Sequence, residues 1–545
     1  MGKLSSILKL RPYIKKHRLI FVAGIIGMLL GSIVSTPVPY IIGIIMDKVL
    51  IAKKGYNLLY MYASVIAILY ILRYVISIAS NYMFVKINNL VVNDLRCSVM
   101  DKVMELPMNY LANTEKGYVQ SRIGECSSVG SIFSPTYIGI ILSLTDAVLA
   151  LVTMFAINYK LSIVVLILTP LFFFATKMSM GNFMKNTKEM LENNATLNGE
   201  CFEIINGIED IKILNGKQSH LKKFNKKLSK LVKSSLKQSK STIMFMGNIT
   251  VINNFGTLLV LLVAGILILK GQFTVGLYTS FSLYIAKVFS SVQGIGTLGT
   301  MIKPVCLSIE RLYELLDMDD ENTGKNQFLN DKINNIKLEN VVFKYKNNTK
   351  NVLNNINFEI NQGEKVIIKG ENGSGKSTII KLLLGLYKPD EGKILCNNID
   401  ISVINNKSLR ERIGIVSQSI FLFRGTVLDN ILYGQNEKKL EDVETLIKKL
   451  GLVEYINRLP KGLDTEITQN TSGVSGGQAQ VIAFIRVILS NKDVIILDEP
   501  ISNVDALTRD LILGILRDED FEGTLIVVSH VVEGMDFINR VIEIK

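Results

Sequence analysis

Nine consecutive residues carry the strongest chemical signal in the chain: Gly370-Glu371-Asn372-Gly373-Ser374-Gly375-Lys376-Ser377-Thr378. They follow the apolar run 366–368 and precede an apolar helical run at 379–386. Glycines let backbone amides wrap around phosphate groups, and a helix N-terminus adds a partial positive charge. In such a loop Lys376 reaches the β- and γ-phosphates of a nucleotide, and the Ser377 hydroxyl ligates Mg²⁺. The pattern predicts a site for ATP and Mg²⁺.

A second signal is a pair of acids that follows four apolar residues, in Val494-Ile495-Ile496-Leu497-Asp498-Glu499-Pro500. A continuous apolar run of this length suits a strand buried on both faces of a parallel sheet. Ligands of open α/β sheets bind at the carboxyl ends of such strands. Asp498 is therefore the candidate for the Mg²⁺ shell, and Glu499 is the candidate that orients and polarises the attacking water.

A third motif, Val474-Ser475-Gly476-Gly477-Gln478, opens the apolar helical run 481–489. Here the sequence resembles the ATP-binding cassette (ABC) transporters, whose signature is a Ser-Gly-Gly-Gln motif. A helix N-terminus with a serine hydroxyl and glycine amides can donate hydrogen bonds to a γ-phosphate. In that family the signature of one cassette faces the phosphate loop of another. With one loop and one signature, the resemblance implies a dimer with a second copy of this chain or with a related half-transporter.

The resemblance gives roles to four further residues. Tyr345, in 342–345, matches the aromatic residue that stacks on adenine. Gln418 matches the glutamine that senses Mg²⁺ and couples to the membrane domain, and Asp505 matches the aspartate of a loop that crosses the dimer interface. His530 matches the switch histidine that contacts the γ-phosphate.

Three segments depart from the family pattern. Gln478-Ala479-Gln480-Val481 lacks the usual final arginine, and Ile501-Ser502-Asn503-Val504-Asp505 replaces the common Thr-Ser-Ala-Leu-Asp. Thr465-Glu466-Ile467-Thr468-Gln469 stands where exporters often carry Thr-Glu-Val-Gly-Glu. No catalytic group is lost, but the last segment normally contacts the partner's membrane helices, so coupling there is open to question.

The first half of the chain holds long apolar runs, and a run of roughly 20 residues is enough to cross a bilayer. We predict six spans, near 19–46, 57–80, 132–157, 160–177, 243–270 and 274–302. The first is longer than the bilayer is thick and carries Pro37 and Pro39, so it should tilt or kink. The predicted fold is an all-α six-helix transmembrane domain plus an α/β ATPase domain. The boundaries are an interfacial helix at 1–17, the membrane domain at 18–305, a linker at 306–332 and the nucleotide-binding domain at 333–545.

The loops between the spans predict the orientation. The short loops at 47–56, 158–159 and 270–273 fall on one side, and the long insertions 81–131 and 178–242 fall on the other with both chain ends. Lysine-rich flanks face the cytosol, so the N-terminus and the ATPase domain should be cytosolic. The insertions read as helices that extend beyond the bilayer, joined by turn regions near 106–122 and 200–216.

The net charge of +13 allows two interpretations, a nucleic-acid partner or the basic flanks of membrane helices. The lysines concentrate beside apolar spans, notably from Lys222 to Lys240, so we expect contact with membrane lipid and no nucleic-acid partner. The five cysteines form no CxxC pair, which indicates reduced thiols and no cysteine metal site.

Three charged residues lie inside predicted spans: Arg73, Asp146 and Lys287. Charge within a membrane is costly and often marks a transport pathway. Arg73 and Asp146 could instead pair structurally, and Lys287 could snorkel. The sequence leaves both interpretations open.

A membrane half fused ahead of one cassette resembles exporters of the bacterial cell membrane, which work by alternating access. The preferred cargo is a small or modified peptide, and no peptidase-like segment precedes the membrane half, so leader cleavage in the same chain is not expected. The alternatives are a lipid or hydrophobic-drug exporter and an ATP-gated channel or regulator. The presence of Glu499 with His530 favours a pump, because a gate that only binds ATP could dispense with both.

Overall fold

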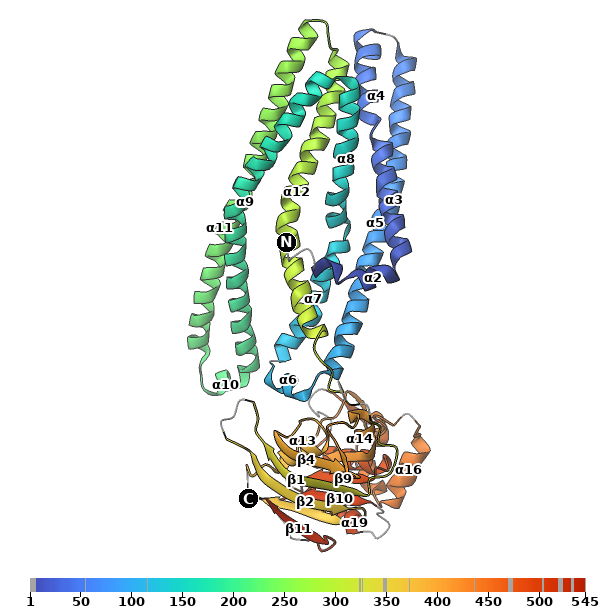
Figure 1. The fold of residues 1–545 in the computed structure, drawn as a ribbon, viewed down its shortest axis with the longest axis vertical. Helices are drawn as coiled ribbons and strands as arrows, with labels where there is room; N and C mark the ends of the chain where they lie inside the picture. Colours follow the sequence, from blue (N-terminus) through green and yellow to red (C-terminus); the bar gives the residue numbers. More distant parts are fainter. Residues whose placement is uncertain are drawn as a thin grey trace. The chain divides into compact units, whose positions relative to one another are not determined.

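The computed structural model describes the chain in two compact units (Figure 1). The membrane unit comprises Met1–Asp101 with Gly117–Asp317, and the ATPase unit comprises Lys102–Lys116 with Met318–Lys545. The described residues are all except 1–5, 54, 115, 323–324, 326, 347–349, 372, 436, 469–473, 502–503, 518–522, 531–533 and 545. Each unit is described by itself.

The described residues of the membrane unit form helices joined by short turns. Its elements are α2 (Arg11–Lys16), α3 (Arg18–Ser35), α4 (Val38–Ile44), the π-helix η1 (Ile45–Ile51), α5 (Tyr56–Glu105), α7 (Lys116–Gly130), the 3₁₀-helix η2 (Ser131–Phe133), α8 (Pro135–Ile157), α9 (Tyr159–Asn206), α10 (Ile208–Ile213), α11 (Lys217–Leu269) and α12 (Val275–Leu316).

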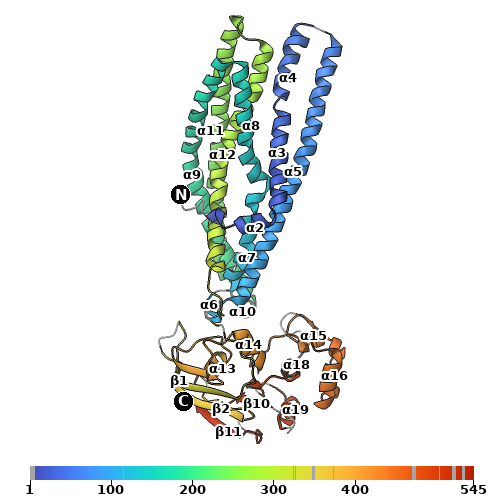
Figure 2. The ribbon, with the colours of Figure 1, turned by 45° about the vertical axis from the view of Figure 1, so that its right-hand side comes forward.

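Four helical segments among the described residues are long and apolar enough to cross a membrane: Arg18–Ile51, Tyr56–Glu105, Gly117–Ile157 and Lys217–Leu269. The spans predicted at 160–177 and 274–302 lie within α9 and α12, outside these four. Figure 1 and Figure 2 both show α9 and α11 side by side. Buried aromatic residues of α12, among them Phe281, Tyr284 and Phe289, form a core with α8, α9 and α11.

The first span breaks at Pro37, as predicted from its length and its prolines. α3 ends at Ser35, α4 begins at Val38, and the helix continues as η1. Proline has no backbone N–H to donate, so carbonyl groups in the preceding turn lose their helical partner. Pro39 leaves the Ser35 carbonyl oxygen without its helical partner, and Lys287 Nζ donates to that oxygen at 3.1 Å inside the membrane unit. The Tyr284 hydroxyl donates to the neighbouring Thr36 carbonyl oxygen at 2.6 Å.

Helices α5, α9 and α11 run well past the apolar spans, as expected for the insertions. α6 (Met108–Asn113) and α10 are the short helices that follow α5 and α9. The second turn region is shorter than predicted, because α9 continues to Asn206 and the turn begins only at Gly207.

The linker expected at 306–332 is wrong in its first part, since α12 continues to Leu316. Cys306, Ile309 and Leu312 are buried at a spacing of three residues, which places them on one helix face. This apolar stripe keeps the segment helical although polar residues follow soon after it.

The ATPase unit contains a five-stranded sheet in the order β11-β3-β10-β9-β6, all parallel. Its strands are β3 (Lys365–Gly370), β6 (Ile413–Val416), β9 (Val494–Asp498), β10 (Thr524–Val528) and β11 (Arg540–Ile544). A second sheet, which the sequence did not indicate, is antiparallel in the order β2-β1-β4-β5. It is formed by β1 (Asn335–Phe343), β2 (Leu353–Asn361), β4 (Glu391–Cys396) and β5 (Ile399–Asp400), and a third pair joins β7 (Gly425–Thr426) to β8 (Glu466–Ile467).

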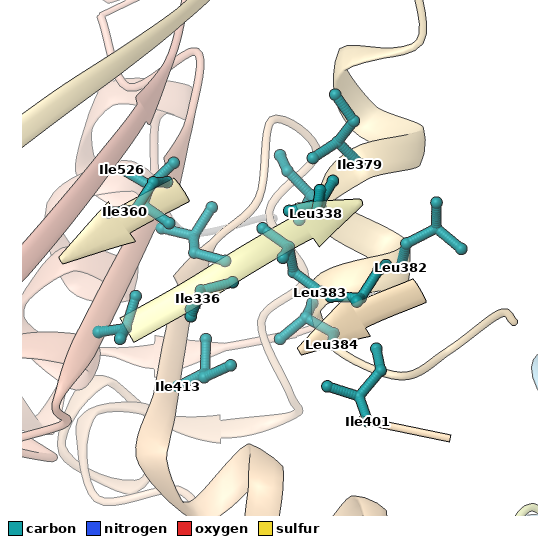
Figure 3. Packing of buried hydrophobic residues seen from close by; sticks show 14 of the residues in the cluster. Ile336, Leu338, Ile360, Ile379, Leu382, Leu383, Leu384, Ile401, Ile413 and Ile526 are labelled. Atoms are coloured by element: carbon teal, nitrogen blue, oxygen red, sulfur yellow. The ribbon is translucent and has the colours of Figure 1, made fainter. Parts of the chain in front are cut away.

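The remaining helices of this unit cover and connect the sheets. They are α13 (Lys376–Leu383), α14 (Asn406–Arg412), α15 (Val427–Ile431), α16 (Leu440–Lys449), α17 (Val453–Asn457), η3 (Gly462–Asp464), α18 (Gly476–Leu489) and α19 (Ala506–Arg517). Figure 3 shows Ile336 and Leu338 of β1 in one buried cluster with Ile379 and Leu383 of α13. The cluster also includes Ile526 of β10, so one core joins both sheets to α13.

The register of the parallel sheet places three strand ends next to each other. Val528 of β10 pairs with Ile368 of β3 and with Asp498 of β9. On the other side of β9, Leu497 pairs with Val416 of β6. The loops that follow these strands therefore leave from one edge of the sheet.

We expect Val494→Ala to destabilise the ATPase unit by about 2 kcal/mol, because it removes two methyl groups from a fully buried site and leaves a cavity. Val541→Ala is the matched control, since Val541 is 48% exposed and should change stability by less than about 0.5 kcal/mol. Hydrogen exchange of the β9 and β10 amides in the purified full chain measures both values. Equal effects of the two substitutions would contradict the assigned packing.

Candidate nucleotide site

The phosphate loop connects β3 to α13. β3 ends at Gly370 and α13 begins at Lys376, while Gly373 and Gly375 have φ of +88° and +94°. A Cβ at Gly375 would also collide with the Leu353 side chain. Both glycines therefore meet a backbone requirement that other L-residues meet poorly. Asn372, which the sequence also placed in this loop, lies outside the described residues.

Lys376 is held inside the loop. Its Nζ donates to the carbonyl oxygens of Gly370 and Glu371 at 2.8 and 2.9 Å, and the residue is 8% exposed. A cavity of about 870 Å³ opens beside the loop and is lined by Glu371, Gly373, Ser374 and His530 among others. The hydroxyl oxygen of Ser374 is buried with no hydrogen-bond partner among the described residues. A phosphate oxygen would accept a hydrogen bond from that hydroxyl, so the loop fits a polyphosphate.

Tyr345 lies in an aromatic cluster next to the loop helix. Its ring packs edge-on against Phe343 and Tyr387, with centroid distances of 4.9 and 5.5 Å. Its hydroxyl shares a hydrogen bond of 3.2 Å with Thr378 Oγ1, and Lys381 Nζ lies 5.7 Å from the ring centroid. Sequence reasoning found Tyr345 but missed Lys381. The signal was available, because Lys381 stands three residues after Thr378 on one face of α13.

Glu499 joins two other candidate residues at the carboxyl edge of the sheet. Gln418 Nε2 donates to Glu499 Oε2 at 2.8 Å, and His530 Nδ1 lies 3.5 Å from Glu499 Oε1. Glu499 adopts a left-handed backbone with φ of +50°, and its N–H donates to the Val528 carbonyl oxygen at 2.8 Å. A left-handed non-glycine residue is strained, and such strain clusters at functional sites. The carboxylate is thus aimed by backbone and side-chain contacts together.

Asp498 is buried at the end of β9, with 9% of its surface exposed. Burial raises the pKa of its carboxyl, the neighbouring Glu499 charge adds to this, and Lys376 and Lys381 act in the opposite direction. The position therefore favours a bound cation whenever the carboxylate is ionised.

The oxygen donors expected for Mg²⁺ are the exposed Ser377 hydroxyl, the Gln418 amide and the Asp498 carboxylate. Among the described residues no three acidic, histidine or cysteine side chains form a metal cluster. Mg²⁺ in nucleotide sites usually has one or two carboxylates plus substrate phosphates and water instead of an all-protein cage. The donor set fits that mode.

The signature motif forms the start of α18. Ser475 is the N-cap, its Oγ accepts from Gln478 N at 3.2 Å, and its own N–H donates to Gln478 Oε1 at 2.8 Å. This capping box fixes the first turn. Ser475 and Gly476 are exposed, whereas Gly477 is buried. The helix N-terminus therefore presents donors to solvent.

Asp505 is tied to the helix that begins beside it. Its carboxylate accepts from Thr508 Oγ1 at 2.7 Å and Thr508 N at 3.2 Å, and these hydrogen bonds lower the pKa of Asp505. A Cβ on Gly477 would approach both Asp505 and Thr508 to 3.2 Å. The signature helix and the Asp505 loop are thus in close contact.

Comparison with known proteins matches both halves of the chain. Residues 21–292 match the family model of the ABC transporter transmembrane region, and residues 353–502 match a second family model, described as ABC transporter. The chain belongs to the ABC transporters. As predicted, this ABC transporter combines a helical transmembrane domain with an α/β ATPase domain that binds and hydrolyses ATP.

Two relatives match almost the whole chain. The transport/processing ATP-binding protein ComA of Streptococcus pneumoniae is 27% identical over 529 residues, which are 96% of this chain and 73% of ComA. The lactococcin-A transport/processing protein LcnC of Lactococcus lactis is 27% identical over 543 residues, 99% of this chain and 75% of LcnC. A bacterial Atm1-family ABC exporter structure with ATP bound shares the fold, with a TM-score of 0.82 and 20% identity over 97% of this chain and 93% of that chain.

The departures of this transporter from the family pattern have visible packing consequences. Val481, where the family usually has arginine, is 1% exposed in an apolar cluster. Gln480 donates to the Pro500 carbonyl oxygen, which ties α18 to the segment after Glu499. Gln469, Ser502 and Asn503 lie outside the described residues.

We expect Asp498→Asn to stabilise the ligand-free transporter at neutral pH. Because the folded-state pKa of Asp498 is raised, its contribution to stability is present below the unfolded pKa of about 3.9 and is lost as pH rises through the folded pKa. Removing the charge should therefore raise the melting temperature by a few degrees near pH 7.5, about what 1 kcal/mol gives a domain of this size.

Thermal unfolding of the ligand-free protein across pH measures this effect. The gain should shrink as pH falls, and Asp536→Asn, whose side chain is 89% exposed, should show none. A lower melting temperature for Asp498→Asn, or a gain that does not depend on pH, would refute the assigned cost of this buried carboxylate.

Proposed function

We propose that this ABC transporter is half of an ATP-driven exporter in a bacterial cell membrane, with its N-terminus and ATPase unit in the cytosol. The single observation that supports ATP-driven pumping is the Gln418–Glu499–His530 cluster, which lies beyond the ends of neighbouring parallel strands. Bacterial relatives and the lysine-rich extensions of α9 and α11 support the location.

In this proposal Glu499 orients and polarises the water that attacks the γ-phosphate. Its left-handed backbone and the Gln418 hydrogen bond hold the carboxylate in one position before substrate arrives. His530, 54% exposed, is free to turn from Glu499 toward the phosphate. Lys376 exchanges its loop carbonyl partners for phosphate oxygens, and Tyr345 stacks on adenine. Mg²⁺, when bound through Ser377, Gln418 and Asp498, neutralises charge on the phosphates.

We expect Glu499→Gln to lower the steady-state ATPase rate by about 10²–10⁴-fold, the usual size of a lost general base. The amide keeps the shape and the contact with Gln418 but cannot polarise water in the same way. Phosphate release from the chain reconstituted in lipid measures the rate, and Glu444→Gln, an exposed acid on α16, serves as the matched control. Retained activity in Glu499→Gln would remove Glu499 from the proposed chemistry.

The active unit we propose is a dimer, either with a second copy or with a related half-transporter, in which each signature contacts ATP on the other cassette. The exposed Ser475 and Gly476 at the N-terminus of α18 support this arrangement, since they offer donors to a phosphate outside their own subunit. Asp505 lies in the adjoining exposed loop, where it would face the partner.

Mixing two inactive forms tests the shared site. Lys376→Ala removes a phosphate ligand, and Ser475→Arg blocks a signature. In a dimer with one copy of each variant, one site carries both defects and the other carries neither. Equal mixing makes about half of the dimers of this kind, each with one intact site, so about a quarter of wild-type activity should return. Each variant alone is the control. No recovery after verified mixing would mean that the signature serves its own cassette or that a different partner is required.

The cargo we propose is a small or modified peptide. The names of ComA and LcnC describe transport and processing, and that of LcnC specifies lactococcin A. A panel of peptides, lipids and dyes tests the choice, because a transported class should raise the ATPase rate above its basal value. Stimulation by lipid or dye alone would favour a lipid or drug exporter. ATP binding without hydrolysis would favour a gate.

A further inference from the structure

Two cavities in the membrane unit both have residues of α8 in their walls. The first has a volume of about 210 Å³ and lies between α3, α5 and α8. Its walls are mostly small and polar, and they include Ser77, Asn81 and Ser143. Arg73 and Asp146 contribute the two charged side chains that line it.

The two charged side chains that line this cavity are not paired with each other. Among the described residues, no ion pair within 4 Å and no hydrogen bond engages the exposed Arg73, and Asp146 Oδ1 is buried without a partner. Lys287, which does not line this cavity, donates to the Ser35 carbonyl oxygen at 3.1 Å. Within the part of the chain that the structure describes, Arg73 is thus a cation with no counter-ion in contact inside a membrane segment. Such a charge is costly unless an anion joins it.

The second cavity is larger and uncharged. It has a volume of about 530 Å³ and lies at the break between α3 and α4, where α8 and α12 complete its wall. Tyr40, Ile157, Leu277 and Tyr284 line it. Apolar and aromatic walls with a few hydroxyl groups suit an apolar side chain.

The two cavities are close enough for one short peptide segment. Ser32 and Thr36, one helical turn apart, line the first and the second cavity, and so do Asp146 and Thr153. At about 1.5 Å per helical residue these separations are about 6 and 10 Å. An extended chain advances about 3.3 Å per residue, so roughly two or three residues connect the cavities.

We propose that these cavities bind the C-terminal end of the exported peptide. The terminal carboxylate pairs with Arg73, and an apolar side chain two or three residues earlier occupies the second cavity. The planar guanidinium matches a carboxylate with two parallel hydrogen bonds, and Ser77 and Asn81 offer further donors. This inference rests on the proposed peptide export, and it makes Arg73 a specificity-determining residue.

The chain has no tryptophan, so the transporter adds no tryptophan fluorescence to that of a tryptophan-containing peptide. The probe is acetyl-Leu-Ile-Gly-Trp with either a free carboxylate or a terminal amide. Binding to the Glu499→Gln protein in phosphatidylcholine nanodiscs is measured by fluorescence without nucleotide. We expect the acid to bind about tenfold more tightly than the amide, the difference that one charge-assisted contact commonly gives.

Substitutions distinguish the effect of the Arg73 charge from the effect of the volume of the first cavity. Arg73→Gln should reduce the affinity for the acid to that for the amide, Arg73→Lys should keep part of the difference, and unchanged amide binding shows that the variants are folded. Gly139→Val should weaken both peptides, because Gly139 lines the first cavity and a Cβ there meets nothing within 4 Å. Gly265→Val, on α11 with equally open space, is the matched control and should change neither.

The outcomes distinguish this inference from the peptide-export proposal. Equal binding of acid and amide, with ATPase stimulation by both in the unsubstituted protein, would overturn the inference and leave peptide export standing. If neither this pair nor any peptide of the panel raises the ATPase rate, peptide export itself fails. If phosphatidylglycerol in the disc abolishes the preference for the acid, the first cavity takes an anionic headgroup and the peptide assignment is wrong.

Discussion

The parallel pairing of β10 with both β3 and β9 is the constraint on which the ATPase unit depends. Because Val528 is in register with Ile368 and Asp498, the phosphate loop, the His530 loop and the Asp498–Glu499 pair must leave the sheet at neighbouring points. The buried cluster that α13 shares with strands of both sheets then fixes the loop helix. The relative positions of the site residues therefore follow from strand register.

The same edge of the sheet concentrates energetic costs. Glu499 has a left-handed backbone, and Asp498 is an acid in a buried position beside another acid. A protein selected for stability alone would relieve both. They persist because the fully buried strands around them contribute enough folding free energy to offset these costs. Phosphate chemistry also needs closely spaced oxygen donors with fixed orientation.

The membrane unit handles its polar groups differently, since no water competes for them in the bilayer. At the Pro37 break the Thr36 carbonyl oxygen accepts a hydrogen bond from the Tyr284 hydroxyl, and one residue earlier the Ser35 carbonyl oxygen accepts one from Lys287 Nζ. Both donors come from α12, which therefore fastens the broken first span. The break also leaves room that α8 and α12 enclose, and that room is the larger of the two cavities discussed above.

The sequence alone determined the two-part architecture, the break at Pro37 and the motif residues, because each depends on local composition or on a contiguous pattern. It placed the linker too early, since the stripe of Cys306, Ile309 and Leu312 becomes decisive only when other helices cover it. It also missed the antiparallel sheet, Lys381 beside Tyr345, and the convergence of Gln418, Glu499 and His530 by contact. These depend on strand order and side-chain packing between segments far apart in the chain, which only the tertiary structure decides.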